Sequence, residues 1–210
     1  MHTCLTVVKI PTGRGKVSKF YCQQSQENSL VAIFPDENYN SDRPLLYYAK
    51  KAALIEGYDV LCISYRRKLT WRDMGLYTID IEADSGTDIV RKCLKKTYKR
   101  IFFVSKGIGT EVAGIVSNRL GYEKIRNIFL SPTYHTIKHI ANSRCIVVVG
   151  TNDSIFTQNC ISKIQEHRNV EFISIKDANR HLEVPDNINK TMEVLGQVTG
   201  TYARFFKELV

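Results

Sequence analysis

The residues with the clearest chemical potential lie where an apolar run, Ile101 to Val104, meets a glycine-rich corner that opens into helix-like sequence. A buried strand, a tight turn and a helix in this order form the geometry that presents a nucleophilic serine in the motif G-x-S-x-G. Here the corner reads Ser105-Lys-Gly-Ile-Gly-Thr110. With Gly109 as the small residue that lets the helix pack closely after the turn, the apex falls on Gly107. The apex therefore has no side chain that can attack a substrate.

Two later segments contain the acid and the base that would accompany such a nucleophile. Arg144 to Asp153 reads as a buried strand ending in an acid, and Asp177 to His181 reads as a loop after a strand from Val170 to Ile175. In a serine triad the serine attacks a carbonyl carbon, the histidine moves the proton, and the acid fixes the imidazole tautomer. Apex, acid and histidine follow one another along this chain in an order that such triads use.

On these residues the chain resembles the small, single-domain, bacterial-type α/β-hydrolases, over roughly residues 28 to 210. The resemblance implies that Asp153 is the triad acid, that His181 is the base, and that Gly107 occupies the position of a missing serine. It implies a serine esterase acting on small esters, thioesters or amides. Without the serine, the protein as it stands is expected to be inactive or very weakly active.

The resemblance also implies an oxyanion hole made of backbone N–H groups from Ile108 and from the Asp36–Glu37 loop. That loop follows the short apolar run Leu30 to Phe34, which Pro35 ends. Families with a working hole tend to carry glycine there, whereas this loop has two adjacent acids. Carboxylates beside a developing oxyanion oppose catalysis unless both side chains turn outward.

Each of these assignments has a simpler alternative. Ser105 becomes the nucleophile if the register is different, although it lies on the strand, two residues before the turn. Lys106 is a further candidate, as an amine with a lowered pKa. Asp153 could simply cap a helix that starts at Ile155, and His181 could be an ordinary histidine of a surface loop.

The elements that position these residues alternate between strand and helix, which is typical of a mainly parallel sheet covered on both faces. We therefore predict an α/β-hydrolase fold with an antiparallel N-terminal edge. The predicted strands are Leu5 to Ile10, Val17 to Gln24, Leu30 to Phe34, Tyr58 to Ser64, Ile101 to Val104, Ile125 to Leu130, a strand from about Cys145, and Val170 to Ile175. The predicted helices are Pro44 to Glu56 with Asp42 as cap, Ile79 to Tyr98, Glu111 to Leu120, Ile155 to His167, and Pro185 to Leu209.

The connection in which α/β-hydrolases carry lid domains is short in this chain. Only Ser131 to Ser143 separates two strands there, so we predict no lid and a site open to solvent. The single tryptophan, Trp71, lies in a polar and aromatic stretch and is a candidate to line the site, although a lone tryptophan is more often a packing residue.

Length and composition favour one domain, residues 1–210, because 210 residues with 43% hydrophobic content can bury a full core. No apolar run approaches the roughly 18 residues of a membrane span, and the N-terminus does not resemble a signal peptide, so we expect a cytoplasmic protein. The six cysteines, at positions 4, 22, 62, 93, 145 and 160, form no C-x-x-C pair, and we expect reduced thiols, no metal and no cofactor.

The net charge of +9 is the remaining signal. Basic residues gather at Arg66 to Lys68 and in a run that ends a predicted helix: Arg91, Lys92, Lys95, Lys96, Lys99 and Arg100. The simplest interpretation is a solvated helix face, since no motif for nucleic acid accompanies the run. We expect a small ester-like substrate or ligand, no nucleic acid and no membrane.

Two classes of function remain. The first is a silenced serine hydrolase, in which Gly107 is a natural or an engineered replacement, or in which His181 activates water for residual hydrolysis. The second is a non-catalytic binding protein on a hydrolase scaffold, with a basic surface for an anionic ligand or partner.

Overall fold

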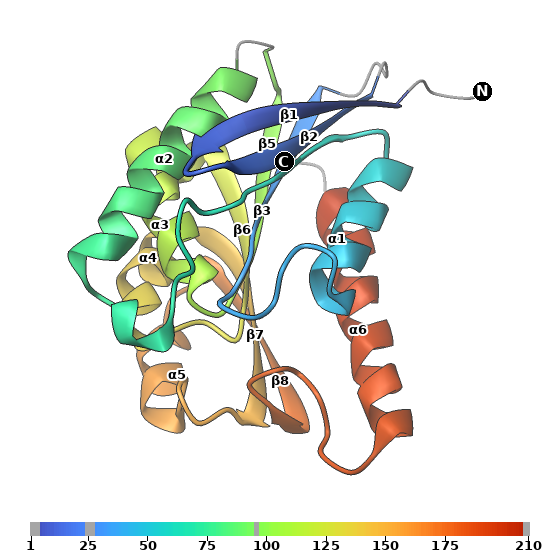
Figure 1. The fold of residues 1–210 in the computed structure, drawn as a ribbon. Helices are drawn as coiled ribbons and strands as arrows, with labels where there is room; N and C mark the ends of the chain where they lie inside the picture. The colour runs from blue at the N-terminus through green and yellow to red at the C-terminus, as the bar shows by residue number, and fades with distance from the viewer. Residues whose placement is uncertain (1–4, 24–27, 95–96, 208–210) are drawn as a thin grey trace.

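Eight strands form a single sheet in the order β1-β2-β4-β3-β5-β6-β7-β8, shown in Figure 1. This arrangement comes from a computed structural model that describes residues 5–23, 28–94 and 97–207. The pairing is parallel from β4 and β3 across the sheet to β8. The strand bounds are Leu5–Gly13, Lys16–Gln23, Ser29–Phe34, Asp59–Cys62, Arg100–Lys106, Ile125–Leu130, Arg144–Asn152 and Val170–Asn179, for β1 to β8 in turn.

The N-terminal hairpin forms the antiparallel edge. β1 pairs with β2, and β2 pairs antiparallel with β4. Arg14 and Gly15 both have positive φ, at 49° and 71°. A two-residue turn of this kind matches the right-handed twist of the strands that it joins. The predicted mixed sheet with an antiparallel N-terminal edge is confirmed.

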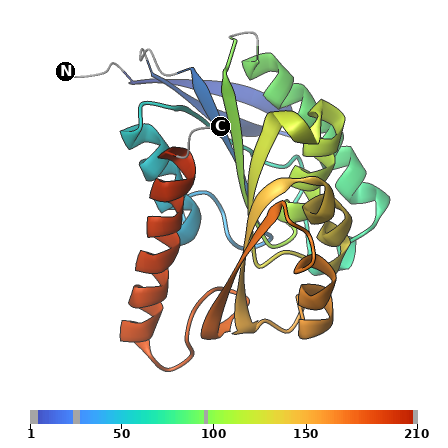
Figure 2. The ribbon, with the colours of Figure 1, turned by 180° about the vertical axis from the view of Figure 1, so that it is seen from behind.

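Helices cover both faces of the sheet (Figures 1 and 2). On one face α1 (Pro44–Ile55) and α6 (Ile188–Lys207) pack over the cluster that contains Phe102 and Tyr202. On the other face lie α2 (Tyr77–Cys93), α3 (Gly109–Leu120), α4 (Ile137–Asn142) and α5 (Gln158–Ile164). The described residues also contain three short 3-10 turns: η1 (Trp71–Asp73), η2 (Tyr122–Lys124) and η3 (Tyr134–Thr136).

Several element ends differ from the sequence-based prediction. Asp42 does not cap α1, because Arg43 stands at the cap and Asp42 instead accepts a hydrogen bond from Lys50 at 3.1 Å. The helix expected to reach Tyr98 ends at Cys93, and the Tyr98 hydroxyl binds Asp59 at 2.7 Å. The strand expected to stop at Ile175 continues to Asn179 and takes in part of the predicted loop.

Some residues named in the sequence-based predictions lie outside the described residues. They are Cys4, Gln24, Lys95, Lys96 and Leu209. Cys62, Cys93, Cys145 and Cys160 are free thiols. None of the helices within the described ranges has the length and apolar character needed to cross a lipid bilayer.

The connection between β6 and β7 contains only η3 and α4. Nothing in it covers the carboxyl ends of the parallel strands, where ligands bind in open α/β sheets. The predicted absence of a lid is confirmed.

Candidate active-site cleft

Gly107 forms the turn between β5 and α3, with φ at +54°. Few residues other than glycine adopt this left-handed conformation without strain. Gly107 donates its N–H to the carbonyl of Leu130 on the neighbouring strand, at 3.0 Å. Gly109 lies against the end of β3, since a Cβ there would be 2.2 Å from the Pro35 carbonyl oxygen. The structure thus forms the strand, turn and helix that the corner residues predict.

The carboxylate of Asp36 lies over Gly107. A Cβ on Gly107 would be 2.1 Å from Asp36 Cγ and 2.1 Å from Oδ2, so this carboxylate fills the space that a side chain at the apex would need. Asp36 Oδ1 also accepts the backbone N–H of Ile108 at 2.9 Å. The N–H that the sequence assigns to an oxyanion hole is therefore bound to an anion of the chain itself.

The N–H of Asp36, expected to contribute to the oxyanion hole, is used within the loop itself. The backbone N–H of Asp36 donates to the Tyr39 carbonyl at 3.1 Å, which closes a turn within the loop. Asp36 turns its carboxylate inward because the absent side chain of Gly107 leaves room and the N–H of Ile108 offers a hydrogen bond. Glu37, the second acid of the loop, lines the same cleft and is half-buried.

Asp153 is buried at the end of β7, with its side chain fully shielded from solvent. Oδ1 accepts the N–H groups of Ile155 and Phe156 at 2.8 and 3.0 Å, and the Arg180 guanidinium lies 3.8 Å from the same oxygen. Oδ2 has no hydrogen-bond partner among the described residues. Asp153 thus binds the loop that precedes α5, and the helix begins only at Gln158.

His181 follows β8 in an exposed turn. Its backbone N–H donates to Asn179 Oδ1 at 2.8 Å, and within the described residues its imidazole makes no hydrogen bond to Asp153. Arg180, its neighbour, turns toward Asp153 instead. The structure brings the predicted acid and base to the same end of the sheet but does not join them into a relay.

Ser105, the alternative nucleophile, lies inside the sheet. Its side chain is fully buried on β5, and its hydroxyl donates to the Ile128 carbonyl at 3.2 Å. A substrate cannot reach an atom in this position without opening the sheet. The hydroxyl serves the packing between β5 and β6.

Lys106 is a buried cation that the sequence analysis placed only as a minor candidate. Its ammonium donates to the Arg180 carbonyl at 2.9 Å and lies 5.0 Å from the centroid of the Tyr39 ring. Burial lowers the pKa of Lys106 to about 8, against the opposing attraction of the Asp36 carboxylate. Lysine is almost never fully buried unless it is paired, so the residue type alone gave no sign that Lys106 would be buried.

The lowered pKa of Lys106 predicts a pH-dependent stability difference between the parent chain and Lys106→Met. Between about pH 8 and the ordinary value of 10.5, the unfolded chain holds a proton that the folded chain has lost. Stability therefore gains from Lys106 deprotonation as pH rises through this range. We expect the free energy of unfolding of Lys106→Met, relative to the parent, to fall by about 2–3 kcal/mol between about pH 7 and pH 10, by chemical denaturation.

Lys50→Met is the matched control for this measurement. Burial is the largest single influence and opposes the charge of Lys50 too, but the hydrogen bond to Asp42 and the attraction of Cys62, Tyr21 and Asp42 together outweigh it, and the pKa is raised. The corresponding difference should not fall over the same range. A pH-independent difference for Lys106→Met would show that its ammonium keeps its proton.

The cleft beside the corner has a volume of about 320 Å³. Asp36, Glu37, Arg180 and His181 contribute its charged or titratable groups, and Trp71 stands at its rim with 62% of its surface exposed. The expectation that Trp71 is a packing residue is wrong, because η1 turns the ring toward solvent, where the Arg72 guanidinium lies 5.3 Å from it. In the part of the chain that the structure describes, no cluster of His, Cys, Asp and Glu side chains is arranged to hold a metal ion.

Comparisons with known proteins agree with this geometry at the level of the fold. No family model matches the chain, and no curated protein matches it in sequence. Among solved structures, an α/β serine hydrolase homologue from Coxiella burnetii superposes with a TM-score of 0.68 at 12% identity, covering 98% of both chains.

Two further structures show the same likeness. An α/β serine hydrolase without a lid from Xanthomonas campestris has a TM-score of 0.67 at 12% identity, covering 98% of this chain and 97% of that one. An esterase from Pyrococcus furiosus has a TM-score of 0.66 at 13% identity, covering 98% of this chain and 92% of that one. Together with the sheet order and the short connection between β6 and β7, these matches identify the chain as a protein of the lidless α/β-hydrolase fold.

Proposed function

We propose that this protein is a catalytically silent relative of the serine esterases, whose cleft binds a small ester-like molecule without turning it over. The observation that carries the proposal is the carboxylate of Asp36, which fills the space above Gly107 and accepts the N–H of Ile108. An oxyanion that developed there would meet a negative charge at the donor meant to stabilise it.

The other groups of the site support the same conclusion. Gly107 offers no nucleophile, and Asp153 is paired with Arg180 at 3.8 Å, not with His181. Removing the nucleophile alone from a subtilisin-type triad lowers turnover about a millionfold. Residual hydrolysis through water activated by His181 also loses its support, because no acid among the residues that the structure describes orients the imidazole.

The cleft itself persists, which favours a binding role over a wholly vestigial site. Its 320 Å³ lies near the lower end of the range for small-molecule sites. Trp71 and Met74 give it apolar surface beside the polar groups of Arg180 and His181. Without a lid, the opening suits a small ligand and offers no cover for a long acyl chain.

Phenyl acetate tests both halves of the proposal in one titration. Trp71 is the only tryptophan of the chain and stands at the cleft, so its fluorescence reports occupancy directly. We expect a saturable change in fluorescence with phenol release no faster than in buffer. His181→Ala should leave phenol release unchanged, since Asp153 pairs with Arg180 and does not orient the His181 imidazole to activate water.

Either half can fail on its own. Phenol release that is faster than in buffer and that His181→Ala abolishes would overturn the proposed inactivity. The protein would then be an active hydrolase. If the Trp71 fluorescence does not change up to the solubility limit of phenyl acetate, the proposal that the cleft binds an ester-like ligand is overturned.

A further inference from the structure

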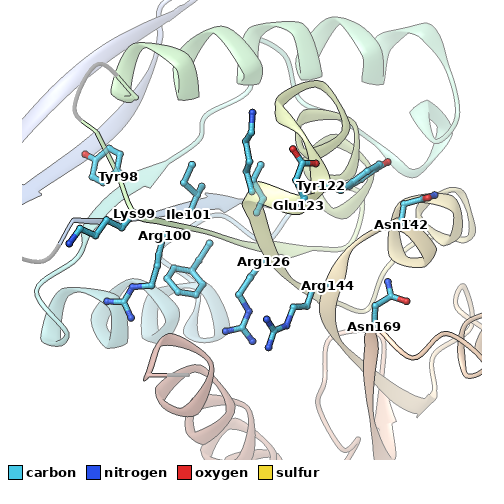
Figure 3. Close-up of a pocket in the computed structure, with 13 residues that line it drawn as sticks. Tyr98, Lys99, Arg100, Ile101, Tyr122, Glu123, Arg126, Asn142, Arg144 and Asn169 are labelled. Atoms are coloured by element: carbon cyan, nitrogen blue, oxygen red, sulfur yellow. The ribbon is translucent and has the colours of Figure 1, made fainter. Parts of the chain in front are cut away.

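A second cavity, shown in Figure 3, lies at the end of the sheet where β5, β6 and β7 begin. Its volume is about 640 Å³, twice that of the cleft. It is lined by the residues at the start of β5, β6 and β7, namely Arg100, Ile125 and Arg144. The cleft, in contrast, lies at the carboxyl ends of these strands. The resemblance to the hydrolases assigns no role to the end of the sheet where these parallel strands begin.

Positive charge converges on this cavity from distant parts of the chain. Five basic side chains and one carboxylate, Glu123, line it; the basic side chains are those of Lys99, Arg100, Lys124, Arg126 and Arg144. Lys99 and Arg100 end the basic run that the sequence suggests is a solvated helix face. Instead, the end of that run meets arginines of two other strands inside one concavity.

Arg126 and Arg144 form the centre of this basic cavity. They are direct partners in the β6–β7 ladder, so their side chains leave the same face of the sheet, and Figure 3 shows both guanidinium groups pointing the same way. Partners on neighbouring strands are close, and like charges placed opposite each other destabilise a sheet. Within the described residues the side chain of Arg144 makes no hydrogen bond or ion pair. An anion between the two guanidinium groups would accept hydrogen bonds from both.

The surroundings extend this positive charge. An adjoining cavity shares Arg126 and Arg144 and adds Arg168. Its carboxylate, Glu171, is already held by the guanidinium of Arg204. The other basic cluster of the sequence behaves differently, because Arg66 and Arg67 lie beside the carboxylates of Glu82 and Asp73 at 3.8 and 3.6 Å.

Aromatic rings hold two of the arginines in place. The guanidinium of Arg126 lies 5.0 Å from the centroid of the Phe205 ring, and that of Arg100 lies 5.1 Å from the Tyr58 ring. Arg100 also donates from Nε to the Ser29 hydroxyl at 3.0 Å. Stacked guanidinium groups lose less rotamer freedom on binding, which favours bidentate recognition of a planar or tetrahedral anion.

We propose that this amino-terminal cavity binds a small molecule that carries a phosphate or diphosphate group, with Arg126 and Arg144 as its principal contacts. The guanidinium group of arginine binds two phosphate oxygens through paired N–H donors, whereas the ammonium group of lysine acts as a point charge. The volume falls within the range of small-molecule sites. The arginines meet in a concavity and not along an extended face, which favours a compact ligand over a nucleic acid.

Pyrophosphate is the probe, titrated by calorimetry into the full chain at about 0.15 M salt, where exposed charges are screened. We expect saturable binding with one equivalent. Arg144→Glu should weaken the affinity at least about tenfold, because it reverses a charge that faces the ligand. Arg144→Lys should weaken the affinity by a smaller factor, since lysine keeps the positive charge but lacks the paired N–H donors of the guanidinium group.

Arg91→Glu is the matched control, because Arg91 is exposed on α2, carries the same charge change and does not line the cavity. It should alter the affinity less than about twofold. Equal weakening by Arg91→Glu and Arg144→Glu would overturn the proposal in favour of general surface charge. Absence of saturable pyrophosphate binding would overturn it too, as would binding of a single-stranded RNA oligomer that the two variants weaken alike.

Discussion

Gly107→Ser alone is expected to leave turnover of p-nitrophenyl acetate at the level of the parent chain, whereas Gly107→Ser combined with Asp36→Ala should raise it roughly a hundredfold. The reason is steric and electrostatic at once. A side chain at position 107 would begin 2.1 Å from Asp36 Cγ, and Ile108 N–H is already occupied by Asp36 Oδ1. Restoring the serine therefore requires removal of the carboxylate that has taken its place.

The expected gain is far below the full effect of a triad, which is about a millionfold. Arg180, and not His181, is the residue that lies near Asp153, and the imidazole must turn to reach the acid. The Oδ2 atom of Asp153, which has no hydrogen-bond partner among the described residues, offers that imidazole an acceptor. His181 already lines the same cleft as Asp36 and Ile108, so the movement needed is one of a side chain in an exposed turn.

Two controls separate this mechanism from a general opening of the cleft. Asp36→Ala alone should stay inactive, because it supplies no nucleophile. His181→Ala in the double variant should remove the gain. An active Gly107→Ser single variant would show that the Asp36 side chain moves away from residue 107 at little cost. An inactive double variant would show that Asp153 and His181 cannot form a relay.

The sequence predicts the fold well because its main signals are local. Apolar runs such as Leu30 to Phe34 are fully buried strands, and glycines of the corner set the turn between β5 and α3. The order of strands and helices along the chain then leaves few topologies for a mainly parallel sheet. The same local logic identifies Gly107, Asp153 and His181 as residues at one end of that sheet.

The direction in which side chains face depends on contacts that no local pattern contains. Asp36 and Ile108 are 72 positions apart, and the carboxylate turns inward only because the glycine between β5 and α3 leaves space for it. At the other side of the site β8 runs on to Asn179, after which Leu182, with φ at 59°, is buried and His181 is exposed. Burial of Leu182 thus decides which neighbour faces Asp153.

The basic residues show the same division between local and long-range information. The run from Arg91 to Arg100 is visible in the sequence, and its helical spacing correctly indicates a helix as far as Cys93. The end of this run, Lys99 and Arg100, lies in the same cavity as Arg126 and Arg144 because β5, β6 and β7 are paired side by side. Only the sheet register makes these separate residues a single cavity.

Gly109→Ala is expected to lower the free energy of unfolding by about 3 kcal/mol, because a Cβ at this position meets backbone atoms that cannot move independently. That Cβ would lie 2.2 Å from the Pro35 carbonyl oxygen and 2.7 Å from the Phe34 carbonyl oxygen. Relief requires α3 to move away from the end of β3. The midpoint of thermal unfolding should fall by roughly 8 °C for a chain of this size, and urea titration gives the free energy directly.

Gly200→Ala supplies the matched control within another helix. Gly200 lies in α6, and no atom lies within 4 Å of the position that a Cβ would take there, so the methyl group meets open space. Alanine has the higher helix propensity, and this variant should be more stable than the parent by about 0.5–1 kcal/mol. Similar stabilities for the two variants would mean that α3 can shift away from β3 at little cost. The close approach of α3 to β3 would then not be what holds Ile108 N–H against the Asp36 carboxylate.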